Sequence, residues 1–121
     1  MQRLESGRRW EAAAARYLER RGLTVLARSY RCRLGELDLV CREAGALIVV
    51  EVRARGTTAR CSAVESIGPR KRKRIVLATR HLLMCRPELG GLPIRFDVVA
   101  FDAIDTEAPQ VTWVRNAFDA S

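Results

Sequence analysis

The sequence predicts a mixed α/β fold in which the elements follow the order αβββαββ. Three observations predict it: an alanine-rich helical stretch near the start, three apolar segments joined by short turns, and a second helical stretch followed by two further apolar segments. The chain has 121 residues, of which 48% are hydrophobic and 30% charged, a composition typical of a globular domain with a core. We therefore expect a single domain over residues 1–121.

The first half of the chain is expected to form a helix and three strands. In residues 4–21 apolar side chains recur at helical spacing, and Gly22 is suited to end that helix. Strands are expected at 23–31, 35–42 and 46–54, because these segments are rich in residues that favour strands and are separated by short turns. The second and third of these strands should form a hairpin around the turn EAG.

The second half is expected to form a loop, a helix and two strands. Residues 55–69, RGTTARCSAVESIGP, are polar and are expected to be a mobile loop. Pro69 is suited to the first turn of a helix that runs to about Cys85. The strands IRFDVVAFD (94–102) and QVTWVRNAF (110–118) follow. The buried stripe of this helix is expected to comprise four residues: Ile75, Ala78, Leu82 and Cys85.

The charge balance of the chain indicates an anionic partner. Lys and Arg number 22 against 14 Asp and Glu, which gives a net charge of +8 and a pI of about 10.3. Such a balance favours nucleic acid or an anionic membrane surface. The start of the chain contains no apolar stretch of the kind found in signal peptides or membrane helices, so we expect a cytoplasmic protein without membrane contact.

The hairpin pattern places four charged residues on one face of the sheet. If the turn is centred between Ala44 and Gly45, facing residues have numbers that sum to 89. One face then carries three apolar pairs: Leu37 with Val52, Leu39 with Val50, and Cys41 with Ile48. The other face carries the pairs Glu36 with Arg53, Asp38 with Glu51, and Val40 with Val49. A turn one residue longer would spoil both faces, which supports this register.

Asp38 and Glu51 are the candidate metal ligands. Two carboxylates directly opposite each other on antiparallel strands repel unless a cation lies between them. Oxygen ligands suit Mg²⁺ or Mn²⁺, which also bind water and substrate phosphate. Arg53, on the same face, would stabilise negative charge on a phosphate. A surface interpretation is also open, in which Glu36 and Arg53 form an ordinary cross-strand pair and the carboxylates are merely exposed.

A third carboxylate lies on the apolar side of the first helix. Glu11 shares that side with Ala14, Ala15 and Leu18, so it is expected near the sheet. A solvated position at the rim of the helix would fit the same spacing.

The second helix begins with a basic run that favours an anionic partner. Five cations in the first turns of a helix are unfavourable unless that end of the helix meets an anion such as phosphate. A solvated basic face is the alternative interpretation for most of the run. Lys71 shares the stripe of Ile75 and Ala78, so it should point toward the sheet. The residues of the run are Arg70, Lys71, Arg72, Lys73 and Arg74.

Five stretches together resemble the YraN-type family of bacterial proteins, which belongs to the restriction-endonuclease-like superfamily and is similar to archaeal Holliday junction resolvases. These stretches are GRRWEAAAARYLERRGL, GELDLV, EVRAR, SIGPRKRKRIVLATRHLL and IRFDVVAFD. The resemblance implies a restriction-endonuclease-like fold, with a central mixed sheet flanked by helices, and a nuclease for branched DNA that acts as a homodimer. It also implies that Asp38, Glu51 and the backbone carbonyl of Val52 bind Mg²⁺, and that Glu11 completes the site. A role for Arg95 and Asp97 does not follow from it.

One position departs from the superfamily pattern, because Arg53 stands where the motif has lysine. Arginine stays protonated, so Arg53 can stabilise charge but cannot act as a general base. The leading hypothesis is a Mg²⁺- or Mn²⁺-dependent nuclease in which the run at 70–74 binds DNA. A nucleic-acid-binding module that has lost catalysis and a protein-interaction domain are the alternatives. The presence of both Asp38 and Glu51 favours the nuclease over the binding module. Paired carboxylates repel phosphate, so they would not help a surface that only binds nucleic acid.

Overall fold

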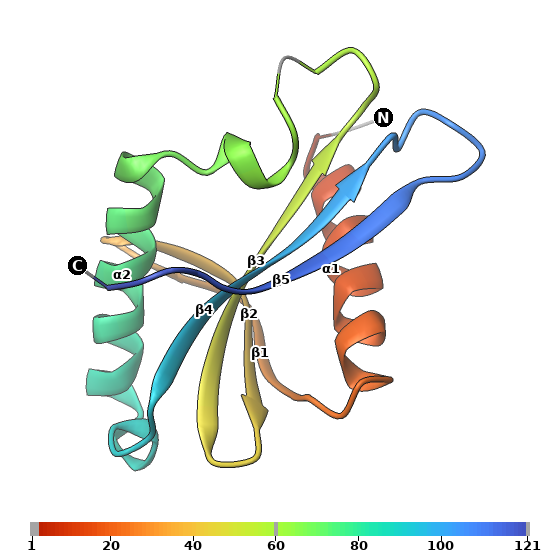
Figure 1. Ribbon diagram of the computed structural model, residues 1–121. Helices are drawn as coiled ribbons and strands as arrows, with labels where there is room; N and C mark the ends of the chain where they lie inside the picture. The colour runs from red at the N-terminus through yellow and green to blue at the C-terminus, as the bar shows by residue number, and fades with distance from the viewer. Residues whose placement is uncertain (1–2, 60, 121) are drawn as a thin grey trace.

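The computed structural model describes residues 3–59 and 61–120 and has a twisted five-stranded sheet with one helix on each face (Figure 1). The seven predicted helices and strands are present within two residues of their expected bounds: α1 (Arg3–Glu19), β1 (Thr24–Cys32), β2 (Gly35–Glu43), β3 (Ala46–Arg55), α2 (Pro69–Cys85), β4 (Ile94–Asp102) and β5 (Gln110–Phe118). Two short 3₁₀ helices, Val64–Ser66 and Pro87–Leu89, lie before and after α2. The prediction of a mixed α/β fold is confirmed.

The strands follow one another across the sheet in the order β1-β2-β3-β4-β5. Neighbours are antiparallel except β3 and β4, which are parallel. Parallel neighbours need a crossover, and the chain makes it through α2. The carboxyl end of β3, the start of α2 and the start of α1 consequently lie on the same side of the molecule, at the top of Figure 1.

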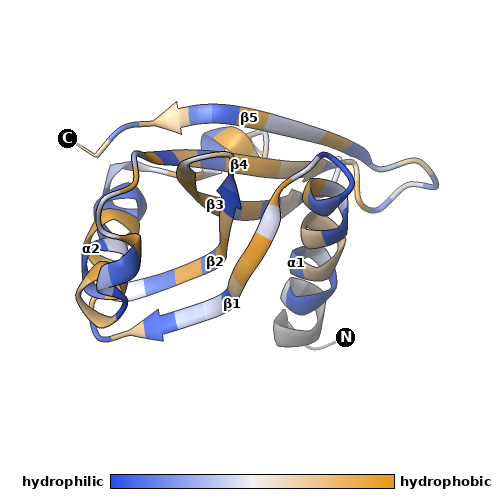
Figure 2. Cartoon of the chain, turned by 90° about the horizontal axis from the view of Figure 1, so that it is seen from below, coloured by the Kyte–Doolittle hydropathy of each residue, from blue (hydrophilic) through white to orange (hydrophobic). Residues whose placement is uncertain are grey.

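The apolar core is divided by the sheet into two layers. Under α1 the core contains Ala14 and Leu18 of the helix with Leu39, Val50 and Val99 of the sheet. The second layer packs under α2: Leu37, Val40, Val49, Ile75, Leu82 and Val98. Figure 2 shows apolar residues along the strands that run between the two helices. Because β3 is buried on both faces, its run of four apolar residues from Leu47 to Val50 is explained by its central position.

The predicted hairpin register is confirmed over the part of the hairpin nearest the turn. The observed partners are Leu39 with Val50, Val40 with Val49, Cys41 with Ile48, Arg42 with Leu47, and Glu43 with Ala46. Beyond Leu39 the two strands separate, and the expected face of Leu37 is wrong: it packs under α2 with Val40, whereas Leu39 packs under α1. The alternation breaks between Leu37 and Leu39, at the level where β2 stops pairing with β3, although β2 still pairs with β1 there and Leu37 lies opposite Tyr30.

Two expectations about the second half need correction. Cys85 was expected on the buried stripe of α2, but it is exposed, because it is the last residue of the helix. The segment 55–69, expected to be a loop, contains a 3₁₀ helix and is held at Ala63, whose N–H donates to Asp102 Oδ1 at 3.0 Å. Asp105 likewise accepts hydrogen bonds from the backbone and hydroxyl of Thr57.

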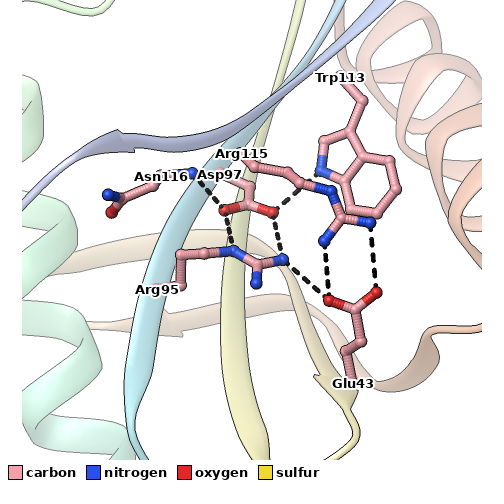
Figure 3. A network of polar contacts seen from close by, with 6 residues as sticks. All are labelled: Glu43, Arg95, Asp97, Trp113, Arg115 and Asn116. Carbon is pink, nitrogen blue, oxygen red and sulfur yellow. Dashed lines mark hydrogen bonds and ion pairs between the residues drawn. The ribbon is translucent and has the colours of Figure 1, made fainter.

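A network of polar contacts joins β4, β5 and the β2–β3 turn (Figure 3). Asp97 is fully buried, and its carboxylate accepts hydrogen bonds from Arg95 Nε at 2.8 Å, Trp113 Nε1 at 2.9 Å and the backbone N–H of Asn116 at 2.9 Å. Arg95 and Arg115 both donate to Glu43. Arg95 and Asp97, whose role did not follow from the sequence, therefore hold the edge strand in place.

Loss of this carboxylate should destabilise the fold. We expect Asp97→Ala to lower the free energy of unfolding by about 2–4 kcal/mol, because Arg95 and the Trp113 indole lose their partly buried acceptor. Urea unfolding followed by circular dichroism measures the change. Glu107→Ala, an exposed residue between β4 and β5, is the control. A loss for Asp97→Ala no greater than that of the control would contradict the structural role.

Candidate functional site

A cleft of about 1240 Å³ opens beside the carboxyl half of β3, where this strand no longer pairs with β2. Its wall is formed by side chains from α1, β1, β2, β3 and the start of α2. Two carboxylates, Glu11 and Asp38, and two of the predicted cations, Arg53 and Lys71, lie on this wall. The structure therefore gathers, from four separate elements, five of the ten candidate site residues: Glu11, Asp38, Val52, Arg53 and Lys71.

Asp38 and Glu51 are in contact at the point where β2 and β3 separate. The backbone N–H of Asp38 donates to Glu51 Oε2 at 3.4 Å, and the backbone N–H of Val52 donates to Asp38 Oδ2 at 2.9 Å. Each carboxylate thus accepts a hydrogen bond from a backbone N–H of the neighbouring strand. It does so at a level where the two strands no longer pair through their backbones. Glu51 is 1% exposed, and Asp38 is half-buried at the cleft surface.

The pair is electrostatically unfavourable when both carboxylates are charged. Burial raises the pKa of Asp38 to about 6, and the nearby charges of Glu11 and Glu36 add to this, although the Val52 N–H and Lys71 act in the opposite direction. Burial, followed by the charge of Asp38, raises the pKa of Glu51 well above its usual value. A bound cation would relieve both the burial penalty and the repulsion.

One oxygen atom of the pair is free to act as a ligand. Within the described residues Glu51 Oε1 is buried without a hydrogen-bond partner. The ammonium group of Lys71 lies 3.9 Å from it, which is an ion-pair distance but too long for a hydrogen bond. Buried carboxylate oxygens are normally satisfied, so this oxygen is an available ligand. Mg²⁺ and Mn²⁺ accept such hard oxygen ligands.

The ligand set of the protein is small. In the part of the chain that the structure describes, no group of three or more His, Cys, Asp or Glu side chains is placed to hold a metal ion. Asp38 and Glu51 with the Val52 carbonyl would be enough for Mg²⁺, which retains several waters in most sites. Glu11, expected to complete the site, lines the same cleft as Asp38, and its Oε1 accepts a hydrogen bond from Ser29 Oγ at 2.7 Å.

Ser29 is a site residue that the sequence did not indicate. It lines the cleft between its ladder neighbours Arg28 and Tyr30, and it has a left-handed φ of 53°. Such a conformation is costly for a residue with a Cβ and is tolerated mainly where the surroundings enforce it. It aims the Ser29 hydroxyl at Glu11. A single serine within a strand pattern carries no signal for this conformation.

Of the two cations nearest the carboxylates, Lys71 lies where it was expected and Arg53 does not. Arg53 was expected opposite Glu36, but its Nε donates to Ser66 Oγ at 2.9 Å, and Glu36 pairs with Arg31 at 3.3 Å. The strands have already separated at this level, so the cross-strand pair cannot form. Lys71, expected to point toward the sheet, does so and contacts Glu51. The positive charge of Lys71 lowers the pKa of Glu51 more than the positive charge of Arg53 does.

The other residues of the basic run do not form one surface. Arg74 and Lys71 line a second cavity of about 270 Å³, which shares Arg31 with the cleft. Arg72 points elsewhere, with its Nε bonded to the Ile67 carbonyl at 3.1 Å. Arg70 and Lys73 are exposed. Helical geometry explains this separation, because successive residues of a helix are about 100° apart around its axis.

A glycine allows α2 to approach this part of the sheet closely. Gly35, at the start of β2, has a φ of +157°, and a Cβ at this position would lie 2.9 Å from the Arg74 carbonyl oxygen. A larger residue would push the turn between β1 and β2 away from α2. Gly35 therefore helps to bring Arg31 and Arg74 to the same cavity.

Comparison with known proteins assigns the chain to a family. A family model described as uncharacterised protein family UPF0102 matches residues 10–101. The chain belongs to this family. A UPF0102 protein of Saccharophagus degradans is 44% identical over 114 residues, which are 94% of this chain and 92% of the relative. UPF0102 proteins of Pseudomonas aeruginosa strain LESB58 and Legionella pneumophila strain Philadelphia 1 are 41% and 40% identical over 96% of this chain, covering 94% and 96% of their own lengths.

UPF0102 is the YraN-type family that the sequence motifs resemble. The match begins at Trp10 in α1 and ends at Phe101 in β4, so it includes all the candidate residues and leaves out β5. Among residues 3–59 and 61–120 no helix is long and apolar enough to cross a membrane.

Proposed function

We propose that this UPF0102 protein is a Mg²⁺- or Mn²⁺-dependent nuclease that cleaves structured DNA in the cytoplasm. The observation that carries the proposal is the contact between Asp38, which lines the cleft, and the buried Glu51. Both have raised pKa values, and Glu51 has a buried oxygen without a hydrogen-bond partner among the described residues. Such an arrangement costs stability unless it serves a ligand. The net charge of +8 agrees with a polyanionic substrate.

Asp38, Glu51 and the Val52 carbonyl would hold the metal ion. When bound, Mg²⁺ would activate water and neutralise charge on the phosphate. Glu11, held by the Ser29 hydroxyl, would accept hydrogen bonds from water at the same cleft. Lys71 and Arg53 would stabilise the negative charge that develops on the phosphate oxygens during hydrolysis. Arg53 remains protonated throughout, so it takes no part in proton transfer.

A DNA-binding module without turnover is the second candidate. It is favoured by Arg53, which replaces the superfamily lysine and whose Nε is held by Ser66. The basic residues of α2 would suffice for this function. Such a module would bind DNA equally well with and without a divalent metal ion, and it would have no use for the buried pair Asp38 and Glu51.

A metal titration separates the two candidates. Calorimetry should detect Mg²⁺ or Mn²⁺ binding to the wild type and not to Asp38→Asn, and the wild type alone should cleave labelled branched DNA when the metal is added. Glu107→Gln, in the connection before β5, is the matched control and should behave as the wild type. DNA binding by the wild type without metal-dependent cleavage of branched, nicked or single-stranded DNA would exclude the nuclease and leave the binding module.

Two arginines two residues apart test the path of the DNA. Arg74→Ala should weaken DNA binding about 3- to 10-fold and make the salt dependence shallower by roughly one phosphate contact, because Arg74 lines the cavity beside the cleft. Arg72→Ala should have a smaller effect, because Arg72 is held by Ile67 and lies 5.4 Å from the Phe118 ring. Fluorescence anisotropy at several salt concentrations measures both. Equal losses would show that the DNA path is not set by the cavity.

A further inference from the structure

The cleft has an apolar part that hydrolysis of a phosphodiester does not require. Trp10, Ala54 and Ile104 line it, and all three also pack against the core under α1. They come from the first helix, from the end of β3 and from the connection between β4 and β5. A cleft of about 1240 Å³ is much larger than a phosphate group and its metal ion require.

Trp10 is held in place and already has a planar group over its ring. Its indole packs on Phe101 with 4.7 Å between ring centroids, and Phe101 is a buried residue of β4. The exposed guanidinium group of Arg9 lies over the indole, 5.0 Å from its centroid. The ring is only half-buried. A flat, fixed and partly exposed aromatic surface is what a nucleobase needs for stacking.

Cations surround this apolar surface. Arg8, Arg31 and Arg55 line the same cleft as Trp10, in addition to Arg53 and Lys71 at the carboxylates. Single-stranded nucleic acid is bound by this combination, because cations neutralise the phosphates while aromatic rings stack on the bases. The apolar part and the carboxylate part of one cleft can therefore contact one nucleotide and its neighbouring phosphate.

We infer that Trp10 and Ile104 form a nucleobase-binding site next to the carboxylate pair, so that the substrate carries an unpaired nucleotide beside the phosphate that is cleaved. This inference rests on the proposed nuclease function. Bases of an intact duplex are stacked on each other and have no free face for Trp10. A single strand, a gap or an extruded base presents such a face.

The test is a binding experiment without metal, so that no cleavage occurs. Fluorescence anisotropy compares a short labelled oligothymidine with a blunt duplex of equal length, for the wild type, Trp10→Leu, Trp10→Phe and Trp113→Phe. Trp113 is bonded to Asp97 and does not line the cleft, so it is the matched control. Trp10→Leu should lose roughly 5- to 100-fold in affinity for oligothymidine, and Trp10→Phe should retain most of it. Affinity for the duplex should change less than about 2-fold in each variant.

A second measurement keeps the inference testable if Trp10→Leu is unfolded. In Trp113→Phe the tryptophan emission comes from Trp10 alone, because the chain has two tryptophans. Oligothymidine should quench this emission, and the duplex should not. Quenching by neither, or affinity for oligothymidine that is independent of Trp10, would overturn the inference.

The outcomes also separate this inference from the proposed function. Stacking on Trp10 without any metal-dependent cleavage would reject the nuclease and keep the nucleobase site. Metal-dependent cleavage of duplex DNA that is unaffected by Trp10→Leu would keep the nuclease and reject the nucleobase site.

Discussion

Replacing Glu51 by Gln is expected to abolish metal-dependent cleavage, with a loss of more than about 100-fold in the single-turnover rate. Glutamine keeps the shape of the side chain but removes the negative charge and replaces one of the two oxygens by an NH2 group, which cannot bind a metal ion. Affinity for DNA in the absence of metal should be unchanged or higher, because a negative charge near the phosphate is lost.

The same substitution should stabilise the metal-free protein at neutral pH. Burial and the neighbouring carboxylate raise the pKa of Glu51, and burial raises the pKa of Asp38 to about 6. A carboxyl group whose pKa is raised by folding contributes stability while it is protonated, below its unfolded pKa of about 4, and this contribution is lost as the pH rises through the folded pKa. The wild type should therefore lose stability, on the order of 2 kcal/mol from this pair, between pH 4 and pH 7.

Urea unfolding across this pH range, with and without Mg²⁺, measures these effects. The difference between the wild type and Glu51→Gln isolates Glu51 and its coupling to Asp38, because all other titrating groups, Asp38 included, are shared. Mg²⁺ should stabilise the wild type at pH 7 and have little effect on Glu51→Gln. Glu36→Gln is the matched control: Glu36 lines the same cleft but is exposed and paired with Arg31. If Glu51→Gln were less stable than the wild type without metal, the interpretation of the pair as a prepared metal site would be wrong.

The helices, the strands and the hairpin register near the turn could be predicted from the sequence, because interactions between residues close in the chain determine them. A strand alternates its side chains with a period of two, and the short turn at Ala44 and Gly45 fixes which residues face each other. Lys71 was also predictable, because helical spacing from Ile75 and Ala78 places it toward the sheet. Each of these predictions depends only on residues that are neighbours in an element or across one turn.

The remaining features of the site depend on contacts between distant segments. Leu37 changes face because β2 separates from β3, and the left-handed conformation of Ser29 on β1 accompanies this separation. Arg53 turns to Ser66, which belongs to a 3₁₀ helix in a segment that was expected to be a loop. Asp97 is buried because its partners come from β4 and β5 together. The spacing of residues within one segment carries no information about contacts with a distant segment.

Arg53 should contribute to the cleavage rate much more than to DNA affinity. We expect Arg53→Ala to lower the single-turnover rate with Mg²⁺ by about 2–4 kcal/mol in transition-state free energy, which is the loss observed when one preorganised donor to a developing negative charge is removed. Arg53→Lys should retain the rate or raise it, because lysine also supplies a fixed positive charge and is the residue at this position in the superfamily motif that the sequence resembles. DNA affinity without metal should change less than about 5-fold in both variants.

Lys71 offers a second test of the role of positive charge, because it is a cation close to Glu51. Its ammonium group is 3.9 Å from Glu51 Oε1, whereas the Arg53 Nε–H is occupied by Ser66. If both cations stabilise the transition state, Lys71→Met should also slow cleavage, and the double variant with Arg53→Ala should lose more than either alone. Arg33→Ala, an exposed residue of the turn between β1 and β2, is the control and should leave the rate unchanged. Single-turnover rates on branched DNA are measured for the wild type and all five variants. If Arg53→Lys is as slow as Arg53→Ala, a positive charge alone does not account for the role of Arg53, and its hydrogen bond to Ser66 is needed for the geometry of the site.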